Sequence, residues 1–379
     1  MLGKGPRKQE AVIHLSFKGV TAIIQFNRDS LQVIVIVKYR ESQCTLKRLI
    51  MRRNRYKLIV FALVLVYVYH FFGVGDYVQS KNFDSDFNYP LNVDIRPIVQ
   101  AILDGQKPNV KPINYYPYKF LSNYRQCSVV NKPDLVIIVK SAIDHFGHRD
   151  AIRKTYGKPH VQGYNVKTFF FLGVDNASSD VQKNITKEMT EFKDIIQMSF
   201  RDSYFNNTIK TVMSFRWIFQ HCAEAQHYLF TDDDMYISVQ NLLKYVSDVT
   251  TASERDGILF AGYVFKSAPQ RFRSSKWRVS LEEYPWDKWP PYVTAGAYVV
   301  SNKAMKMLYV GSLFVKHFRF DDIYLGIVAK KMGIVPTHCP HFHFYKKPYE
   351  REVYSDVIAS HGYSNHDELI RVWNEQNAL

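Results

Sequence analysis

The stretch His227-Tyr-Leu-Phe-Thr-Asp-Asp-Asp-Met-Tyr-Ile237 joins one apolar run to a second through three consecutive carboxylates. A short apolar run of this kind predicts a buried β-strand, so Asp232, Asp233 and Asp234 are expected at the carboxyl end of that strand. Open α/β sheets bind their ligands in the crevice outside the carboxyl ends of their strands. The stretch therefore predicts an α/β fold with an acidic ligand site at one edge of its sheet.

Apolar runs and helical periodicities alternate on both sides of this stretch. Further strands are expected over residues 135–139, 168–172, 194–197, 258–265 and 292–300, and helices over residues 149–156, 209–222, 239–249 and 322–332. The alternation is typical of one α/β domain of about 245 residues, which is within the size range of a single domain. We therefore expect one folded domain over residues 132–379, with a sheet flanked by helices.

Basic residues are concentrated at the start of the chain. The formal net charge is +15, but residues 1–57 contain 13 Lys and Arg against 3 Asp and Glu, whereas the remainder contains 37 against 32. The folded part is therefore only mildly basic, which removes most of the support for a nucleic-acid partner.

An uncharged apolar stretch follows this basic tail. Residues 58–75 contain no Lys, Arg, Asp or Glu, whereas residues 52–57 contain four basic side chains. A helix of that length rises about 27 Å, just enough for the hydrocarbon core of a bilayer. The positive-inside rule then places residues 1–57 in the cytoplasm and the residues after 75 in a lumen. A cleaved signal peptide, which would lie nearer the start, and a buried core helix are the alternatives.

The regions around this anchor complete the expected domain organisation. Residues 76–131 are rich in Asn, Pro, Tyr and Asp and lack sustained periodicity, so they are expected to form a stem. Residues 1–50 show no periodic pattern beyond an apolar run at 33–37, and Met51 immediately precedes the basic cluster. We expect residues 1–50 to be a gene-model extension or an isoform-specific tail.

Cysteines and glycosylation signals suit a lumenal domain. The four cysteines, which match no zinc-ligand spacing, are Cys44, Cys127, Cys222 and Cys339. Only the last three are expected in the lumen, so at most one disulfide can form within the chain, and Cys222 could equally be a free core thiol. The N-glycosylation signals are at Asn176, Asn184 and Asn206.

The acidic triplet has the chemistry of a metal site. Mg²⁺ and Mn²⁺ prefer hard oxygen ligands and usually bind one or two carboxylates together with phosphate oxygens. An aspartate of the triplet is therefore expected to share a metal with a nucleotide diphosphate. A solvated acidic turn is the alternative interpretation.

A second acidic pair, Asp321 and Asp322, opens a predicted helix. Carboxylates are stabilised at the start of a helix, so one of the pair could cap the helix while the other faces a cleft. Between the two acidic sites, Trp289-Pro-Pro-Tyr-Val-Thr-Ala-Gly-Ala297 turns into small residues that would let the backbone approach a ligand. Its aromatic side chains could stack on sugar rings or pack in the core.

Six motifs occur in order along residues 132–375. They are Arg149-Asp-Ala-Ile-Arg-Lys-Thr-Tyr-Gly157, Phe171-Leu-Gly173, Asp202-Ser-Tyr-Phe-Asn-Asn-Thr-Ile-Lys-Thr211, Thr231-Asp-Asp-Asp-Met-Tyr-Ile237, Pro291-Tyr-Val-Thr-Ala-Gly296 and Asp321-Asp-Ile-Tyr-Leu-Gly326. Together they resemble the β-1,3-glycosyltransferase family, which includes β-1,3-galactosyltransferases and β-1,3-N-acetylglucosaminyltransferases. One departure is Tyr156, where the family usually has Trp.

Four further stretches are similar to the brainiac-like members of that family from insects and nematodes. They are Ser275-Lys-Trp277, Ser280-Leu-Glu-Glu-Tyr-Pro285, the run from Phe318 to Ala329, and Val357-Ile-Ala-Ser-His361. This similarity implies β1,3 transfer of N-acetylglucosamine to the mannose of a glycolipid core. The shared motifs do not choose the sugar, so a β-1,3-galactosyltransferase is the main alternative. A glycan-binding module without turnover and a metal-dependent hydrolase are less well supported.

The family resemblance also implies a fold, a location and roles for individual residues. It implies a GT-A fold with a Rossmann-like sheet, a type II Golgi membrane protein, a UDP-sugar donor, Mn²⁺ or Mg²⁺, and inversion at the anomeric carbon. The expected metal ligands are Asp232, Asp234 and His361. His361 is preferred to the group His338, His341 and His343, which we expect to lie on one strand as solvated imidazoles. The expected catalytic base is Asp322, and the residues expected to bind the donor are Arg149, Arg153, Asp202, Lys210, Asp232 and Asp233.

Overall fold

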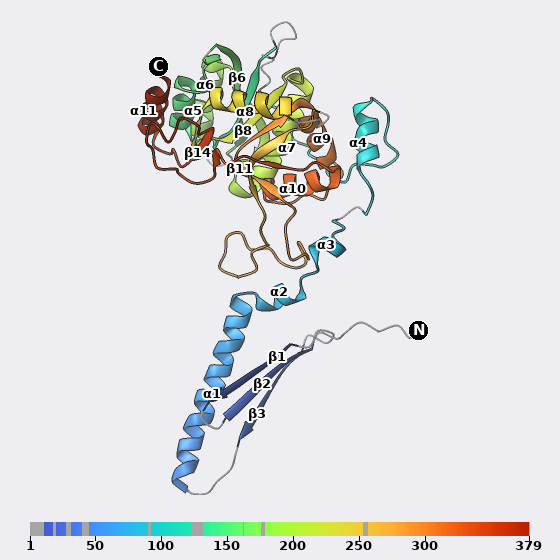
Figure 1. Cartoon of the computed structure of the whole chain (residues 1–379), viewed down its shortest axis with the longest axis vertical. Coiled ribbons are helices and arrows are strands. Elements are labelled where there is room, and N and C mark those ends of the chain that lie inside the picture. The colour runs from blue at the N-terminus through green and yellow to red at the C-terminus, as the bar shows by residue number, and fades with distance from the viewer. Residues whose placement is uncertain are drawn as a thin grey trace. The chain divides into compact units, whose positions relative to one another are not determined.

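The computed structural model describes residues 11–378 apart from residues 18–19, 28–31, 40–44, 90–91, 123–126, 128–131, 162, 176–178 and 253–256. The chain divides into two compact units, one formed by residues 1–86 and 269–287 and the other by residues 87–268 and 288–379. Figure 1 shows the labelled elements of both units. The second unit begins within the range 76–131 that was expected to form a stem.

The first unit contains an antiparallel sheet and three helices. Its elements are β1 Ala11–Phe17, β2 Val20–Asn27, β3 Gln32–Tyr39, α1 Thr45–Phe71, α2 Val74–Gln79 and α3 Phe83–Asp86. Strand β2 pairs with both β1 and β3. The apolar run at residues 33–37 lies in β3, and β1 and β2 were not expected from the sequence.

The fully buried Arg271 organises the inserted segment of the first unit. Its guanidinium donates hydrogen bonds to the carbonyl oxygens of Val279 and Ser280 at 3.0 Å and of Tyr284 and Trp286 at 2.8 Å. Residues 279–286 therefore surround a single side chain that binds four of their carbonyl groups.

No helix in the described part of the chain is both long and apolar enough to span a membrane. The residues expected to form the anchor, 58–75, cover the second half of α1, a turn and the start of α2. The anchor therefore stays a prediction.

The second unit is built on a mixed, eight-stranded sheet. Its strands are β4 Leu135–Lys140, β5 His160–Val161, β6 Tyr164–Val174, β7 Ile195–Arg201, β8 His227–Asp232, β10 Phe260–Phe265, β11 Tyr292–Ser301 and β12 Thr337–His338. The order across the sheet is β7-β6-β4-β8-β11-β10-β12, with β5 antiparallel to the start of β6. Strands β7, β6, β4 and β8 are parallel, and β11 is antiparallel to β8 and β10.

Helices cover both faces of this sheet, directly or by packing on another helix. They are α4 Arg96–Leu103, α5 Phe146–Lys154, α6 Ser179–Phe192, α7 Asn207–His221, α8 Val239–Ala252, α9 Asn302–Ser312, α10 Asp321–Met332 and α11 His366–Asn377, with the short 3-10 helix η1 Tyr204–Asn206 before α7. Of these, α4 packs on α9 and α11 packs on α5. Alternate residues of β6 face opposite layers: Phe169 and Phe171 contact Trp217 of α7, whereas Phe170 contacts Arg153 of α5. Burial of β4 on both faces follows from this covering and explains its uninterrupted apolar sequence.

A second, smaller sheet lies at the C-terminal side of the unit. It contains β9 Met235–Ile237, β13 Phe342–His343 and β14 Ala359–His361, in the order β13-β14-β9. Because β9 follows the acidic triplet directly and pairs with β14, His361 lies opposite Met235. This pairing brings the C-terminal histidine to the triplet.

The segment between residues 87 and 122, which begins the second unit, packs on the rest of that unit. Ile95 and Val99 of the α4 region are buried, and α4 lies against α9. Leu121 donates its backbone N–H to Gln197, and the Ser122 hydroxyl donates to Ile195, both on β7. Cys127 then forms a disulfide with Cys222 at the end of α7.

This disulfide settles the cysteine alternatives. Cys339 is free and buried, so the expected limit of one disulfide within the chain is confirmed, and the alternative of a free core thiol at Cys222 is wrong. Tyr156 is fully buried in the core, which accommodates this aromatic side chain.

Candidate active site

The centre of the candidate site is the junction of β4 and β8. These parallel strands are neighbours in the sheet, and the chain runs from β4 outward to β6 and β7 before it returns to β8 on the other side. Such a reversal of strand order creates a crevice at the carboxyl ends of the strands. Lys140 and Asp232, the last residues of β4 and β8, are opposite each other in register.

Lys140 binds three groups at the base of this crevice. Its ammonium group is 3.0 Å from Asp232 Oδ1, 3.0 Å from Asp321 Oδ2 and 3.1 Å from the carbonyl oxygen of Ala295. Burial alone would lower the pKa of this ammonium, but the two carboxylates outweigh burial and raise its pKa. Lys140 is therefore a fixed positive charge that joins the triplet to α10.

The three aspartates of the triplet contact three different groups. Asp232 pairs with Lys140, Asp233 accepts hydrogen bonds from Ser141 Oγ at 2.6 Å and contacts His145 Nδ1 at 3.0 Å, and Asp234 Oδ2 is 3.1 Å from His361 Nε2. Burial, with the charges of Asp321 and Asp234, raises the pKa of Asp232 to about 6, although Lys140 acts in the opposite direction. The triplet is thus not a solvated turn.

Two of the three expected metal ligands come together. The carboxylate of Asp234 and the imidazole of His361 offer an oxygen and a nitrogen ligand side by side, and their hydrogen bond raises the pKa of His361. Within the described residues, Asp232 does not join them in a three-ligand cluster, because its carboxylate is held by Lys140. One carboxylate and one imidazole suit a divalent ion that also binds diphosphate oxygens.

The acidic pair at the start of α10 has two distinct environments. Asp321 Oδ2 accepts hydrogen bonds from Lys140 and, at 2.8 Å, from Thr211 Oγ1; burial favours the neutral acid, but these contacts lower the pKa of Asp321. Asp322 Oδ1 accepts the backbone N–H of Ile323 at 2.7 Å, and no side-chain donor to Asp322 occurs among the described residues. Burial and the charge of Asp321 raise the pKa of Asp322 to about 7.

The carboxylate of Asp322 makes the contact expected at the helix start, because it accepts the backbone N–H of Ile323 in the first turn of α10. The residue before α10 is Phe320, which makes no side-chain cap, and Asp321 is held in the buried ion pair with Lys140. The helix is placed by Gly326, where a Cβ atom would lie 2.6 Å from the Cβ of Tyr292 on β11. This close approach explains the glycine of the last motif. It also places α10, which begins with the acidic pair, against the start of β11.

Lys210 and Asp202 form a second ion pair beside the crevice. Lys210 Nζ is 2.8 Å from Asp202 Oδ1 and donates to the carbonyl oxygen of Ser141 at 2.6 Å. Asp202 Oδ2 also accepts the backbone N–H of Gly173 at 2.9 Å. Both charges are largely buried. Through these contacts the pair connects β6, α7 and the end of β4, where we expect the donor to bind.

Arg149 and Arg153 are held by ion pairs with acidic side chains. All five N–H donors of Arg149 are engaged, by both carboxylate oxygens of Glu188, by Ser141 Oγ and by two carbonyl oxygens. Arg153 pairs with Asp194 and Glu188 and lies over the ring of Phe192. Their observed contacts are structural, so we do not retain either as a diphosphate ligand.

The histidine group at 338–343 does not form one strand. His338 ends β12 in the large sheet, His343 ends β13 in the small sheet, and His341 between them is 3.1 Å from Asp356. The expectation of a single strand of solvated imidazoles is therefore wrong, because the chain changes sheets between these residues.

Two polar residues of the site were not expected from the sequence. The signal for Lys140 was a buried-strand run that ends in lysine, and the signal for Thr211 was its place at the end of the third motif. Their partner Asp321 lies far along the chain, and the sequence gives no register that would pair them.

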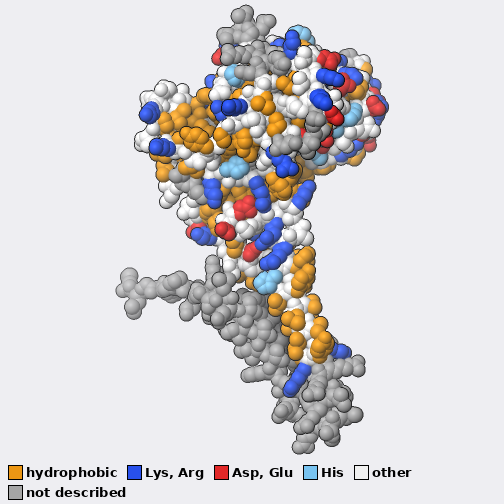
Figure 2. Space-filling view, turned by 180° about the vertical axis from the view of Figure 1, so that it is seen from behind, with side chains coloured by type: hydrophobic (Ala, Val, Ile, Leu, Met, Phe, Trp, Pro, Cys, Tyr) orange, Lys and Arg blue, Asp and Glu red, His pale blue; other side chains and the backbone are white. Residues whose placement is uncertain are grey.

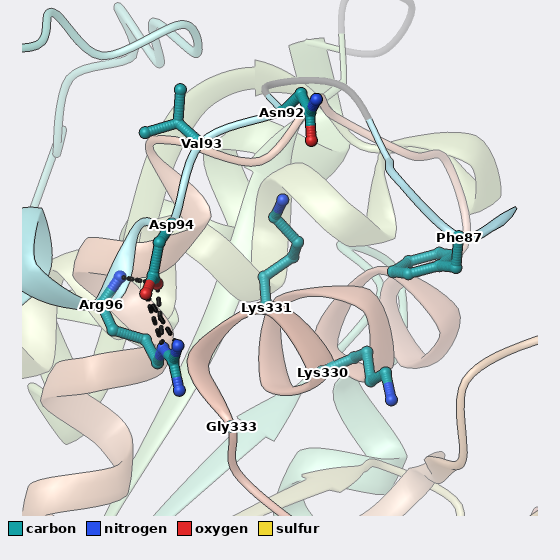
Figure 3. A pocket seen from close by; sticks show the side chains of 8 residues that line it. All are labelled: Phe87, Asn92, Val93, Asp94, Arg96, Lys330, Lys331 and Gly333. Carbon is teal, nitrogen blue, oxygen red and sulfur yellow. Dashed lines mark hydrogen bonds and ion pairs between the residues drawn. The ribbon is translucent and has the colours of Figure 1, made fainter. Parts of the chain in front are cut away.

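A shallow pocket of about 340 Å³ lies elsewhere on the second unit. It is lined by Phe87, Asn92, Val93, Asp94, Arg96, Lys330, Lys331 and Gly333 (Figure 3). The guanidinium of Arg96 is bound to Asp94 at 2.7 Å. The pocket contains none of the residues expected to act in catalysis or donor binding.

Comparisons with known proteins show which sequences this chain resembles. The sequence model of the galactosyltransferase family matches residues 147–340. The chain is 40% identical over 321 residues to "Beta-1,3-galactosyltransferase brn" of Drosophila melanogaster, covering 84% of this chain and 94% of that protein. It is 32% identical to "Beta-1,3-galactosyltransferase 1" of Homo sapiens, over 71% of this chain and 81% of that protein. It is 30% identical to "Lactosylceramide 1,3-N-acetyl-beta-D-glucosaminyltransferase" of Rattus norvegicus, over 86% of this chain and 87% of that protein.

Proposed function

This chain belongs to the galactosyltransferase family and is a β-1,3-glycosyltransferase, and we propose that it transfers N-acetylglucosamine from UDP-N-acetylglucosamine to a glycan with inversion. The proposed acceptor is the β-mannose of a glycolipid core. The observation that carries the catalytic part is Asp322, a carboxylate whose pKa is raised to about 7. No ion pair to Asp322 occurs among the described residues.

Asp322 has the properties of a general base. A base works best when its pKa is near the operating pH, and Asp322 meets this condition because burial and Asp321 disfavour its charged form. In the proposed reaction its carboxylate accepts the proton of the acceptor 3-hydroxyl as that oxygen attacks the anomeric carbon and the bond to UDP breaks. Asp321 does not act as a base because Lys140 and Thr211 bind its carboxylate.

Asp234 and His361 are the residues that we propose hold Mn²⁺ or Mg²⁺. The ion would supply positive charge to the departing diphosphate. Asp232 is then a positioning residue: its ion pair with Lys140 fixes the end of β8 next to Asp234. Asp233, Asp202 and Lys210 line the side of the crevice proposed for the donor.

The donor sugar has one alternative with specific support. The resemblance to brainiac-like enzymes and the rat relative favour N-acetylglucosamine. The names of the Drosophila and human relatives favour galactose. Both donors share the UDP group and differ at C2 and C4 of the sugar, so the pair Asp234 and His361 serves either of them.

We also propose that the enzyme is a type II membrane protein of the Golgi with a lumenal catalytic unit. Two observations support this location. The Cys127–Cys222 disulfide suits an oxidising compartment. Apolar side chains such as Ile59, Leu63 and Tyr67 are exposed on α1, where Figure 2 shows a row of hydrophobic side chains. Exposed apolar surface of this kind needs a membrane or a partner to cover it.

A donor screen tests the proposed function. The purified enzyme is incubated with Mn²⁺, a β-mannoside and either UDP-N-acetylglucosamine or UDP-galactose, and the product linkage is determined by NMR. We expect a β1,3-linked N-acetylglucosamine product, and none from Asp234→Ala, whose folding is checked by thermal unfolding. Transfer from UDP-galactose alone would replace the proposed donor, and full activity of Asp234→Ala would overturn the proposed metal site.

A further inference from the structure

Three histidines gather beside the Asp233 carboxylate. His145 is the residue before α5, His148 lies in the first turn of α5, and His366 begins α11. The rings of His145 and His148 are stacked with centroids 4.4 Å apart, and His366 meets His148 edge-on at 4.5 Å. Neither the expected metal site nor the proposed mechanism uses these rings.

The ligand atoms of this group are close enough to share an ion. His145 Nδ1 is 3.0 Å from Asp233 Oδ2, and ligand atoms of His145, His148 and Asp233 all lie within 4.8 Å of one another. Ligands of a tetrahedral zinc ion, at 2.0–2.2 Å from the metal, are separated by about 3.4 Å. Side-chain rotations that bring these atoms about 1.4 Å closer at most would complete three bonds to one ion.

The surroundings of the three residues hold them in place. His366 Nε2 is 3.1 Å from His148 Nδ1, so this contact orients the His148 ring. Ser141 Oγ donates to Asp233 Oδ2, and Arg149 donates to Ser141 Oγ at 3.1 Å. Such outer contacts fix the orientation of metal ligands and raise affinity.

The chemistry of these ligands differs from that of the Asp234 site. Two imidazoles and one carboxylate favour zinc and related transition metals, whereas Mn²⁺ and Mg²⁺ prefer oxygen ligands. Asp233 is directed to α5, whereas Asp234 is directed to β14, so neighbouring residues serve different groups. The His145 side chain is 41% exposed, which gives an ion access from solvent.

We propose that His145, His148 and Asp233 bind a divalent transition metal of the zinc class, with His366 as the residue that orients His148. Three protein ligands leave a fourth position for water, as in zinc sites that are open to solvent. The site does not depend on which sugar the enzyme transfers or on the identity of the catalytic base.

Zinc and cobalt binding to the full chain test this proposal. After treatment with a chelator and its removal, the detergent-solubilised protein is titrated with Zn²⁺ by calorimetry and with Co²⁺ by visible absorption. We expect a Zn²⁺ site and a four-coordinate Co²⁺ spectrum in the wild type, and both should persist in Asp234→Ala, which lacks the other proposed metal site. His148→Ala and His145→Asn should weaken Zn²⁺ binding by at least about tenfold. His160→Ala, which removes an exposed histidine on β5, should bind as the wild type does.

The variants separate the possible outcomes. Loss of binding in Asp234→Ala with full binding in His148→Ala would place the ion at the other site and overturn the proposal. Equal binding by all variants, or none by the wild type, would also overturn it. Thermal unfolding without metal verifies that each variant is folded, and His145→Asn replaces His148→Ala in the comparison if the latter does not fold.

Discussion

At the scale of single residues, the site depends on the different surroundings of chemically equal groups. Asp321 and Asp322 are adjacent, but Lys140 binds only the first, so one carboxyl has a lowered pKa and the other a pKa of about 7. The sequence could predict both carboxylates and their position at the start of a helix. It could not predict Lys140, because that contact requires the relative positions of β4 and α10.

Asp322→Asn tests the catalytic base. The amide keeps the size of the side chain but removes the basic group, so turnover should fall by about 10²–10⁴-fold at neutral pH. Donor affinity should change little, and unfolding measurements should show no loss of stability, since a carboxylate that is costly to bury has been removed. Transfer rates and UDP-sugar affinity are measured on the same preparation.

Asp321→Asn is the matched control. It weakens the buried ion pair with Lys140 and should reduce stability more than Asp322→Asn does. If Asp322→Asn kept more than about a tenth of the activity while a folded Asp321→Asn had none, the two roles would have to be exchanged.

The rate of transfer should depend on pH through Asp322. Because the pKa of this carboxyl is raised to about 7, it is protonated and inactive as a base below that pH and charged above it. We expect the rate to fall on the acid side of about pH 7. Burial is the main cause of the raised pKa, and the charge of Asp321 is the second. Asp321→Asn removes that charge and lowers the pKa of Asp322, so the fall in rate on the acid side should move to lower pH without disappearing. A fall that is unchanged in Asp321→Asn would contradict the assignment.

At the scale of elements, most predicted strands and helices are confirmed. Continuous apolar runs gave β4, β6 and β8, and helical periodicity gave α7, α8 and α10. The small sheet of β9, β13 and β14 was missed because its strands have only two or three residues each. The family resemblance, and not the periodicity, predicted that His361 lies near the triplet. The physical reason for this proximity is the pairing of β14 with β9.

Gly326→Ala tests how α10 is positioned. A new methyl group would lie 2.6 Å from the Cβ of Tyr292, so the helix would have to move away from β11. We expect a loss of about 1–3 kcal/mol in the free energy of unfolding, with reduced turnover because the acidic pair moves as well. Gly311→Ala on α9 is the control, because its nearest neighbours at 3.1 Å are side-chain atoms of Met332 and Val328 that can adjust. Equal losses for both variants would show that the contact with Tyr292 is not limiting.

At the scale of the whole molecule, the chain combines a first unit that contains the expected anchor with the second unit, which is the catalytic unit. The sequence predicted the order of these regions, but it gave no signal that residues 87–122 pack on the rest of the catalytic unit. Their contacts with β7 use backbone groups and single polar side chains such as Ser122, and such contacts leave no periodic pattern. The strands of the first unit were missed as well.

N-glycosylation tests the lumenal location. Asn184 is exposed on α6, whereas the amide of Asn206 donates to Arg201 and the neighbouring Thr208 is buried. Asn176 lies outside the described residues. We expect Asn184→Gln to remove a glycan, seen as increased gel mobility, and Asn206→Gln to leave mobility unchanged. If the wild type carried no N-glycan and protease added outside intact vesicles digested the catalytic unit, the proposed location would be wrong.

The covering of β7 has a consequence for producing the enzyme as a secreted fragment. Residues 119–122 add backbone hydrogen bonds along β7, the last strand of the parallel half of the sheet. A fragment cut at residue 132 would lose this covering, the disulfide to Cys222 and the packing of α4, and it would expose an unpaired strand edge that favours aggregation. A fragment that starts before Phe87 keeps all three, and it should be secreted in monomeric form where the shorter one aggregates.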